Sequence, residues 1–380
     1  MIFIIPIILI LIGYAKYDFP QKKNKGDFLW GVIYVVLVLI IGLRYKVGGD
    51  TYNYMTYFQW IPEIRYWQPF DSSSFEPGFS FITSVIKTLT DNIYIYQTII
   101  SAVMTIMLMD FINRHTEYRF LALLVVYVAV YPYFSTEIVR ESLAVCGLLV
   151  SYDYLKDKKY LQYFIVCLLL TTIHSSAVVT FLFPIIRHLK FDKRMLIYGL
   201  SVVFLGFFMP RFMDVLAHKF FVFEKLLRYS SQGYVGYLWC GFRFLYFSLL
   251  PILVLLICKN NYKLTCQFEG IICFQILLGL GLWFVPIVFQ RLINYTIVFY
   301  IVSMVQMLGT VMRDPDYWKH FNRQVVNARI GVAKMIIWLT LLAHSSYYIH
   351  LNFYKMYIPY HSVFNPIEVP ERENFVAGNE

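Results

Sequence analysis

Charged residues are scarce in this 380-residue chain, at 15%, whereas hydrophobic residues make up 59% of it. Because soluble globular proteins carry about 25% charged residues, this composition argues against a soluble protein and indicates an integral membrane protein. The few charges are unbalanced, with 33 Lys and Arg against 23 Asp and Glu. They form no basic stripe or motif, so we expect no nucleic-acid partner and attribute the excess to loops that face anionic lipid.

Motifs for metals, nucleotides and disulfides are also missing. The six cysteines lie at positions 146, 167, 240, 258, 266 and 273 without CxxC spacing, which predicts neither a disulfide framework nor a zinc site. There is no Walker loop, HExxH or GxSxG motif, and the DPD at 314–316, which resembles DxD, falls in a predicted cytoplasmic loop. We therefore expect no metal, no cofactor and no ATP-driven chemistry.

Apolar segments divide the chain into about twelve predicted transmembrane helices, because a span needs roughly 20 apolar residues or somewhat fewer. The first segment lacks the basic start and the cleavage site of a signal peptide and is predicted to be a span. The predicted fold class is an all-α integral membrane protein that forms one polytopic domain over 1–380. The spans lie near 1–15, 28–43, 93–112, 120–134, 138–154, 160–173, 176–188, 195–209, 237–257, 267–288, 292–311 and 331–350.

Lys and Arg in the short loops set the predicted orientation. More than half of them face the cytoplasm if loops 16–27, 113–119, 155–160, 187–194, 258–263 and 312–330 lie there. Segment 79–91 is then too short to cross and is predicted to be a helix in the outer interface, or one that re-enters the membrane. Both termini lie outside, and the outer surface is built mainly from residues 44–92, loop 210–236 and tail 351–380.

Ionisable residues gather at the outer ends of these spans, where a buried charge is costly unless it is paired or functional. Arginine's fork of donors suits a phosphate or pyrophosphate, so several arginines together could hold a charged lipid headgroup. The alternative for each arginine is snorkelling or pairing with a nearby carboxylate. The residues concerned are Arg44, Asp50, Glu76, Arg140, His174, Arg211, Arg243 and Arg291.

Three of these positions have a distinctive local setting. Arg140 begins a span and carries its charge into the bundle, where Glu137 or Glu141 could pair with it. His174 marks the turn between two short apolar runs, where a neutral imidazole could accept a proton from a sugar hydroxyl, although a lone His is usually structural. Arg291 is followed one helical turn later by Tyr295 on the same face, and the arginine could equally be an interfacial anchor.

Five motifs occur in order along the chain: GLRYKVGGDTYNY, FEPGFSFITSVI, VRESLAVCGLLVSYDYLKDKKY, IHSSAVV and YIPYHSVF. Together they resemble the EpsG family of Wzy-type polysaccharide polymerases, mostly over the first half of the chain. Glu141 is a departure, because a glutamine is expected after the arginine. The resemblance implies a metal-independent, GT-C-like glycosyltransferase with an outer interfacial helix. Such an enzyme joins undecaprenyl-pyrophosphate-linked oligosaccharide repeat units at the outer face of the bacterial cytoplasmic membrane.

The resemblance and the charges together give a hypothesis for the site. Arginines would bind the donor's pyrophosphate and stabilise the charge that develops as it leaves: Arg44, Arg140 and Arg291, with Arg211 as a further candidate. One of three residues would take the proton from the acceptor hydroxyl: His174, or else Asp50 or Glu76. Tyr295 and Arg243 are additional candidates. The expected partners are the lipid-linked donor and acceptor, membrane lipid and, as a candidate, a chain-length regulator protein.

Two other functions remain open at this point. A flippase for the lipid-linked sugar would also need basic residues in a cavity, but a transporter should distribute its charges across the membrane depth. The charges here gather at one face, which favours the enzyme. An O-antigen ligase or a polyprenyl-phosphate-sugar glycosyltransferase would differ from the polymerase only in its acceptor.

Overall fold

A computed structural model describes residues 2–20, 26–69, 75–217, 241, 243–259, 266–282, 286–313, 331–332, 335, 354–370 and 372. Over these residues the fold is all-helical, and extended pairing is limited to isolated bridges. The chain divides into two compact units, Met1–Thr180 with Leu341–Glu380 and Phe181–Thr340. The predicted all-α class is therefore confirmed, whereas a single polytopic domain stays a prediction.

Two helices in the described part of the chain are long and apolar enough to cross a membrane, Ile93–His115 and Val288–Met307. Several other apolar helices are shorter than 18 residues: Asp27–Gly42, Arg119–Ala129, Tyr160–Ile173, Ser175–Ile186 and Glu269–Gly281. This pattern agrees with a membrane protein, because a helix satisfies its own backbone hydrogen bonds in lipid. The twelve spans and the GT-C-like architecture stay predictions.

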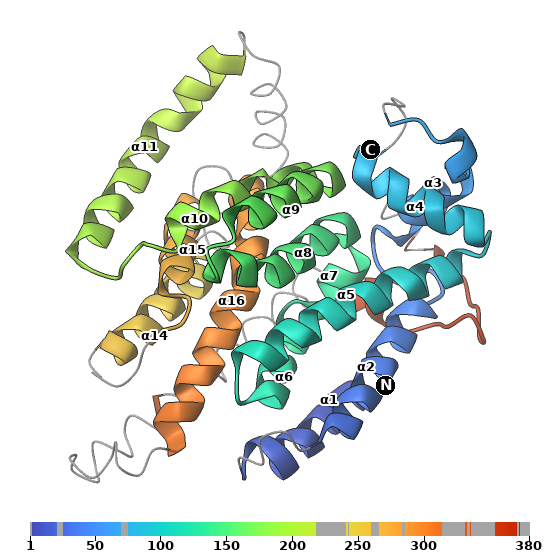
Figure 1. Ribbon diagram of the computed structural model, residues 1–380, viewed down its shortest axis with the longest axis horizontal. Helices are drawn as coiled ribbons and strands as arrows, with labels where there is room; N and C mark the ends of the chain where they lie inside the picture. Colours follow the sequence, from blue (N-terminus) through green and yellow to red (C-terminus); the bar gives the residue numbers. More distant parts are fainter. Residues whose placement is uncertain are drawn as a thin grey trace. The chain divides into compact units, whose positions relative to one another are not determined.

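The first unit is built on apolar helices that pack lengthwise. Figure 1 shows α1, α2 and α5 side by side, and Gly42 allows the close approach of α2 to α5, because a Cβ there would lie 2.4 Å from the Thr98 hydroxyl oxygen. The helices of this group are α1 (Ile4–Gly13) with η1 (Tyr14–Asp18), α2 (Asp27–Gly42), α5 (Ile93–His115), α6 (Arg119–Ala129), α7 (Tyr131–Thr136), α8 (Val139–Lys156) and α9 (Tyr160–Ile173).

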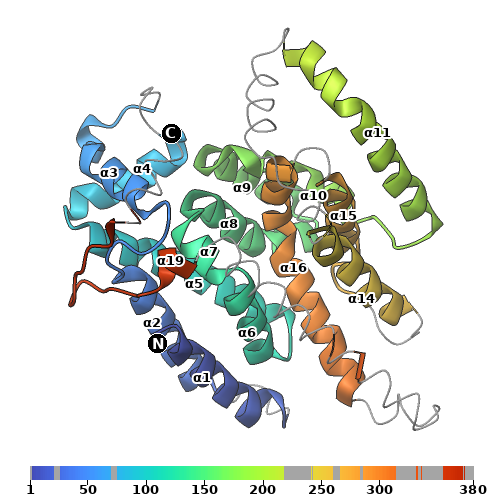
Figure 2. The same cartoon turned by 180° about the vertical axis from the view of Figure 1, so that it is seen from behind.

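Two short helices, α3 (Thr51–Trp60) and α4 (Pro77–Leu89), lie at one end of this group (Figure 2). A one-turn 3-10 helix, η2 (Ile64–Tyr66), lies between them in sequence. The sequence pattern did not predict α3, because its buried face has only two large residues, Tyr54 and Phe58, among polar and exposed aromatic neighbours. In α4 the first helical position is Pro77, which is pre-organised for a helix. Its 13 residues extend about 20 Å, too short for a hydrocarbon core of about 30 Å. A short helix in place of a span is therefore confirmed here, at 77–89 instead of 79–91, and its place in a membrane stays a prediction.

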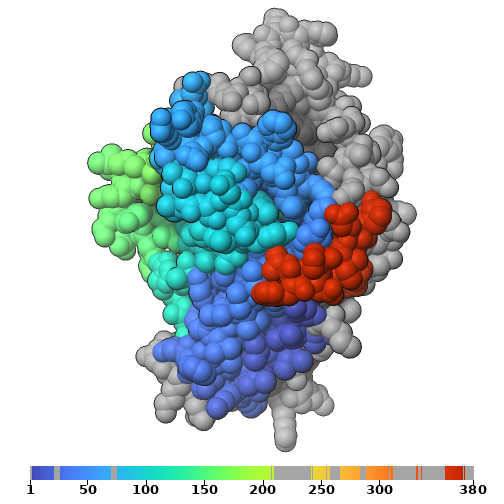
Figure 3. Space-filling view, turned by 90° about the vertical axis from the view of Figure 1, so that its right-hand side faces the viewer, coloured from blue at the N-terminus to red at the C-terminus, as the bar shows by residue number. Residues whose placement is uncertain are grey.

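The segment 354–372, which begins with α19 (Tyr354–Tyr357), returns to the end of α2. The Val363 N–H donates to the Leu43 carbonyl at 3.0 Å, and the Tyr45 N–H donates to the His361 carbonyl at 2.8 Å. Figure 3 shows this segment in red against the blue residues that start the chain. The predicted outer tail is thus ordered against residues 43–48 over the part that the structure describes.

The predicted span 176–188 is wrong as an α-helix. It forms a 3-10 helix, η3 (Ser175–Leu182), followed by the short α10 (Phe183–Ile186). The physical reason is Pro184, which lacks an N–H and whose ring would clash with the carbonyl four residues earlier in a continuous α-helix.

The second unit packs around α15 (Glu269–Gly281), which contacts α11 (Lys193–Ala217), η4 (Leu245–Leu249), α14 (Leu250–Lys259) and α16 (Pro286–Arg313). Because α11 continues to Ala217, the first residues of the predicted loop 210–236 are helical, which corrects that boundary. Residues 218–236 and most of the predicted span 331–350 lie outside the described residues.

Candidate functional site

A tight turn at residues 48–50 is held by a buried carboxylate. Gly48 has φ +107°, in the left-handed region that favours glycine. The N–H groups of Gly49 and Asp50 donate to Glu137 at 2.6 and 3.1 Å. The Tyr357 hydroxyl donates to the same carboxylate at 3.0 Å. Burial raises the pKa of Glu137, although the Gly49 N–H opposes this increase. Glu137 therefore fixes the backbone from which the Asp50 side chain projects.

Arg44 lies in the interior beside this turn and uses its guanidinium on backbone carbonyls. Its Nη1 donates to the Ile41 carbonyl at 2.6 Å and its Nε to the Val47 carbonyl at 3.1 Å. Burial lowers the pKa of Arg44 to about 10. These contacts end α2 and shape the turn, so the geometry favours a positioning role for Arg44 over the expected pyrophosphate contact.

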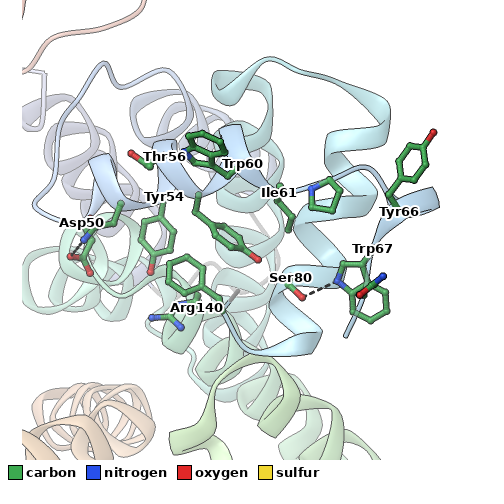
Figure 4. A pocket seen from close by; sticks show the side chains of 14 residues that line it. Asp50, Tyr54, Thr56, Trp60, Ile61, Tyr66, Trp67, Ser80 and Arg140 are labelled. Atoms are coloured by element: carbon green, nitrogen blue, oxygen red, sulfur yellow. Dashed lines mark hydrogen bonds between the residues drawn. The ribbon is translucent and has the colours of Figure 1, made fainter. Parts of the chain in front are cut away.

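A cavity of about 810 Å³ opens between α3, α4 and the start of α8 (Figure 4). This volume lies within the range of about 300–1,000 Å³ that is usual for small-molecule sites. Two charged residues line it, Asp50 and Arg140, and the rest of its wall is aromatic, aliphatic or neutral polar. The aromatic lining residues are Tyr54, Tyr57, Trp60, Tyr66, Trp67 and Phe75.

Arg140 enters the cavity wall from the first turn of α8 and forms an ion pair with Glu76. Its guanidinium carbon lies 3.9 Å from the centre of the Phe75 ring, a cation–π contact. Its Nε is buried and has no hydrogen-bond acceptor among the described residues. The expected pairing of Arg140 with its helical neighbours is therefore replaced by a pair across the fold, and one donor of the guanidinium is left over.

Glu76 stands at the N-cap position of α4, in an extended conformation imposed by the following proline. Burial raises the pKa of its carboxyl, but the Arg140 guanidinium and backbone N–H groups, including that of Ser175, lower it more, so the net pKa lies below its ordinary value. The Ser175 N–H donates to Glu76 at 3.4 Å. Glu76 therefore links the start of α4 to the end of α9.

His174 caps the end of α9 beside this carboxylate. Its Nδ1 lies 2.6 Å from the Ser176 hydroxyl and accepts the Ser176 N–H at 3.3 Å. The Ser176 N–H is directed at Nδ1, which favours the tautomer that carries its proton on Nε2. Close packing brings the two helices together here, since a Cβ on Gly78 of α4 would lie 2.2 Å from the hydroxyl oxygen of Thr172. The geometry makes His174 Nε2 a hydrogen-bond donor in this state rather than a base.

The first unit thus brings together four of the predicted residues in one region: Asp50 and Arg140 at the cavity, with Glu76 on Arg140 and His174 beside Glu76. Apart from Arg44, described above, the remaining candidates belong to the second unit. Arg291 is half-buried and Tyr295 fully buried on α16, and Arg243 is half-buried just before η4. Arg211 lies in α11, and its side chain is outside the described set.

Sequence reasoning missed Glu137 as the residue that organises the turn, and it missed the aromatic wall from α3. Only the GGD sequence at 48–50 offered a signal, because a glycine turn exposes backbone donors that need an acceptor. Tyr54 is one such wall residue; burial raises the pKa of its hydroxyl to about 12, against the lowering effect of the Arg140 charge. Within the described residues, no group of three or more His, Cys, Asp or Glu side chains comes together that could hold a metal.

Comparison with known proteins yields one result. The family model of EpsG matches residues 27–362, which include the turn, the helices that line the cavity and the first part of the segment 354–372. No curated protein and no solved structure matches the chain.

Proposed function

Since the chain belongs to the EpsG family of Wzy-type polysaccharide polymerase-like proteins, we propose that it joins lipid-linked oligosaccharide repeat units into a surface polysaccharide. In this proposal the donor and acceptor are carried on undecaprenyl pyrophosphate, and transfer occurs at the outer face of the bacterial cytoplasmic membrane. A chain-length regulator protein is a proposed partner. One observation carries the proposal: a paired arginine with a spare buried donor stands in the wall of an aromatic cavity.

Arg140 is the proposed contact to the donor's pyrophosphate. Glu76 and the Phe75 ring fix the guanidinium from two sides, so its orientation needs little rearrangement when an anion arrives. Negative charge grows on the bridging oxygen as the anomeric carbon–oxygen bond breaks, and a preorganised donor stabilises this charge more in the transition state than in the ground state. The Nε–H, which has no acceptor, suits an additional phosphate oxygen.

Asp50 is the proposed general base. It lines the cavity, whereas Glu76 is engaged with Arg140 and His174 Nδ1 is engaged with Ser176. In the reaction the acceptor hydroxyl gives its proton to Asp50, its oxygen forms the bond to the anomeric carbon, and undecaprenyl pyrophosphate leaves with the bonding electron pair. His174 would donate from Nε2 to a phosphate oxygen or a sugar hydroxyl.

The test is reconstitution of the purified protein in nanodiscs with synthetic undecaprenyl-pyrophosphate repeat units, without nucleotide. We expect a ladder of multiples of the repeat unit. Arg140→Ala should lower the rate by about 10²–10³-fold, the usual loss for one electrostatic donor. The matched control is Arg119→Ala, which removes a different cation, one paired with Asp27, and should leave the ladder unchanged.

Two outcomes would overturn the proposal. One is a wild-type protein that forms no ladder but moves the lipid-linked sugar across liposomes, which would make it a flippase. The other is an Arg140→Ala variant as active as the wild type. Arg291, Arg211 and Arg243 remain proposed secondary phosphate contacts, to be ranked in the same assay.

A further inference from the structure

The charged residues that line the cavity described above lie toward one of its ends. Figure 4 shows Asp50 and Arg140 toward one end and Tyr66 and Trp67 toward the other. The charged end contains Arg140, the proposed pyrophosphate contact, and Asp50, the proposed base. The lining residues of the other end carry no formal charge, so that end suits a neutral ligand.

The aromatic residues at the uncharged end are open to solvent. Trp60 is 82% exposed and Tyr66 is 62% exposed. Trp67 is held in one orientation, because its Nε1–H donates to the Ser80 hydroxyl at 2.9 Å and its ring meets the Phe81 ring edge-on at 5.1 Å. Large aromatic surfaces left uncovered in this way are typical of binding sites rather than of packing.

Neutral polar groups stand among these rings. The same wall contains the amides of Asn53 and Gln68 and the hydroxyl of Thr56. A sugar ring needs both features. Its C–H face carries slightly positive hydrogens that pack on the negative face of an aromatic ring. Its edge carries hydroxyls that need hydrogen-bond donors and acceptors. A purely lipid-facing surface would need rings but no amides.

We propose that Trp60, Tyr66 and Trp67, with Asn53 and Gln68, form a subsite for the neutral sugars of the growing glycan chain. This inference rests on the proposed polymerase function and adds to it the place where the growing chain lies. A chain held there stays beside the charged end after each transfer, because release requires several stacking contacts to break together. The subsite therefore sets product length and has little effect on the first transfer.

The experiment compares the Trp60→Ala/Tyr66→Ala double variant with wild type in the nanodisc assay. The matched control is Phe28→Ala, which removes an aromatic side chain that is 87% exposed on another helix. We expect the double variant to join the first two repeat units at a rate within about threefold of wild type. We expect its average product to be several times shorter. The control should keep the wild-type length distribution.

A second measurement does not depend on turnover. The nanodisc-embedded protein is titrated with free repeat-unit oligosaccharide that carries no lipid, and intrinsic tryptophan fluorescence reports binding. We expect the double variant to bind about tenfold more weakly than wild type, because stacking contacts are lost. The single variant Trp60→Phe, which keeps an aromatic ring at this position, should keep the wild-type product length. A wild-type protein that binds the free glycan but forms no ladder would contradict the polymerase function and leave the subsite standing.

Three results would overturn the subsite. The double variant could form products of wild-type length, or bind the free glycan with wild-type affinity. It could also differ from wild type only in how its activity depends on the lipid composition of the nanodisc. The last result would assign these rings to the membrane interface.

Discussion

Replacing Glu137 by Gln should loosen the turn that carries Asp50. One carboxylate oxygen accepts the Gly49 N–H at 2.6 Å and the Tyr357 hydroxyl at 3.0 Å, and the other accepts the Asp50 N–H at 3.1 Å. A Gln amide keeps one acceptor oxygen, so in either orientation its NH2 group faces at least one backbone N–H. Each charge-assisted hydrogen bond contributes about 1.5–3 kcal/mol, and we expect a loss of about 2–4 kcal/mol in the free energy of unfolding.

The assay is thermal unfolding of the purified protein together with the ladder assay. For a unit of roughly 200 residues, 1 kcal/mol corresponds to about 2–4 °C, so the Tm should fall by about 4–16 °C. The transfer rate should fall as well, because Asp50 moves with the turn. The control is Glu63→Gln, an exposed carboxyl outside the turn, which should change neither quantity. A Glu137→Gln variant with wild-type Tm and rate would refute the assigned role.

The pH dependence supplies a second readout of the same carboxyl. Burial gives Glu137 a higher pKa in the folded protein than its ordinary value of 4.5. In the window above pH 4.5 the folded state therefore binds a proton that the unfolded state has lost, and stability falls as the pH rises through that window. Glu137→Gln should remove this decline. A decline of the same steepness in the variant would assign it to other groups.

Three further changes test the packing around the site. Glu76→Gln should weaken activity at neutral pH. In the wild type the folded pKa of Glu76 lies below its ordinary value of 4.5, so the contribution of this carboxylate persists above pH 4.5 and is lost as the pH falls below it. A pH–rate profile measures this loss. Gly78→Ala should lower both Tm and activity, because the new Cβ would lie 2.8 Å from the backbone carbonyl carbon of Thr172. The control is Gly31→Ala, whose Cβ would have no atom within 4 Å and which should raise or preserve the Tm. Arg44→Met should lower the free energy of unfolding by about 2–5 kcal/mol, and the Tm with it, since two buried carbonyls lose their donor. An unchanged Tm would contradict the role of Arg44 at the end of α2.

Local pattern predicted most of the helices. The predicted span 160–173 coincides with α9, and 138–154 lies within two residues of α8, because a continuous apolar run has few alternatives to a helix. The failures have local causes as well. Pro184 prevents a continuous α-helix in one predicted span, which forms a 3-10 helix instead. The buried face of α3 has only Tyr54 and Phe58 as large residues, which is too short a pattern to predict a helix.

The site itself was only partly predictable. Residue type and position identified Asp50, Glu76, Arg140 and His174 as candidates, because a charge at the end of an apolar run needs a reason. Their partners were not predictable, since Arg140 and Glu76 are 64 positions apart and Glu137 and Tyr357 are 220 apart. Spacing along a helix indicated only the neighbours of Arg140, and the fold paired it elsewhere.

The contact between residues 43–48 and the segment 354–372 also determines when the site can be completed. Tyr45 and its partner Glu368 are 323 positions apart, so at 5–20 residues per second the ribosome needs about 15–65 s to deliver the second after the first. During that interval the N–H groups of Tyr45 and Gly48 lack their acceptors, the carbonyls of His361 and Met356. A chain that ends before residue 354 would thus keep the contacts of the turn to Glu137 but lack those to the segment 354–372, and we expect the proposed activity only once that segment is in place.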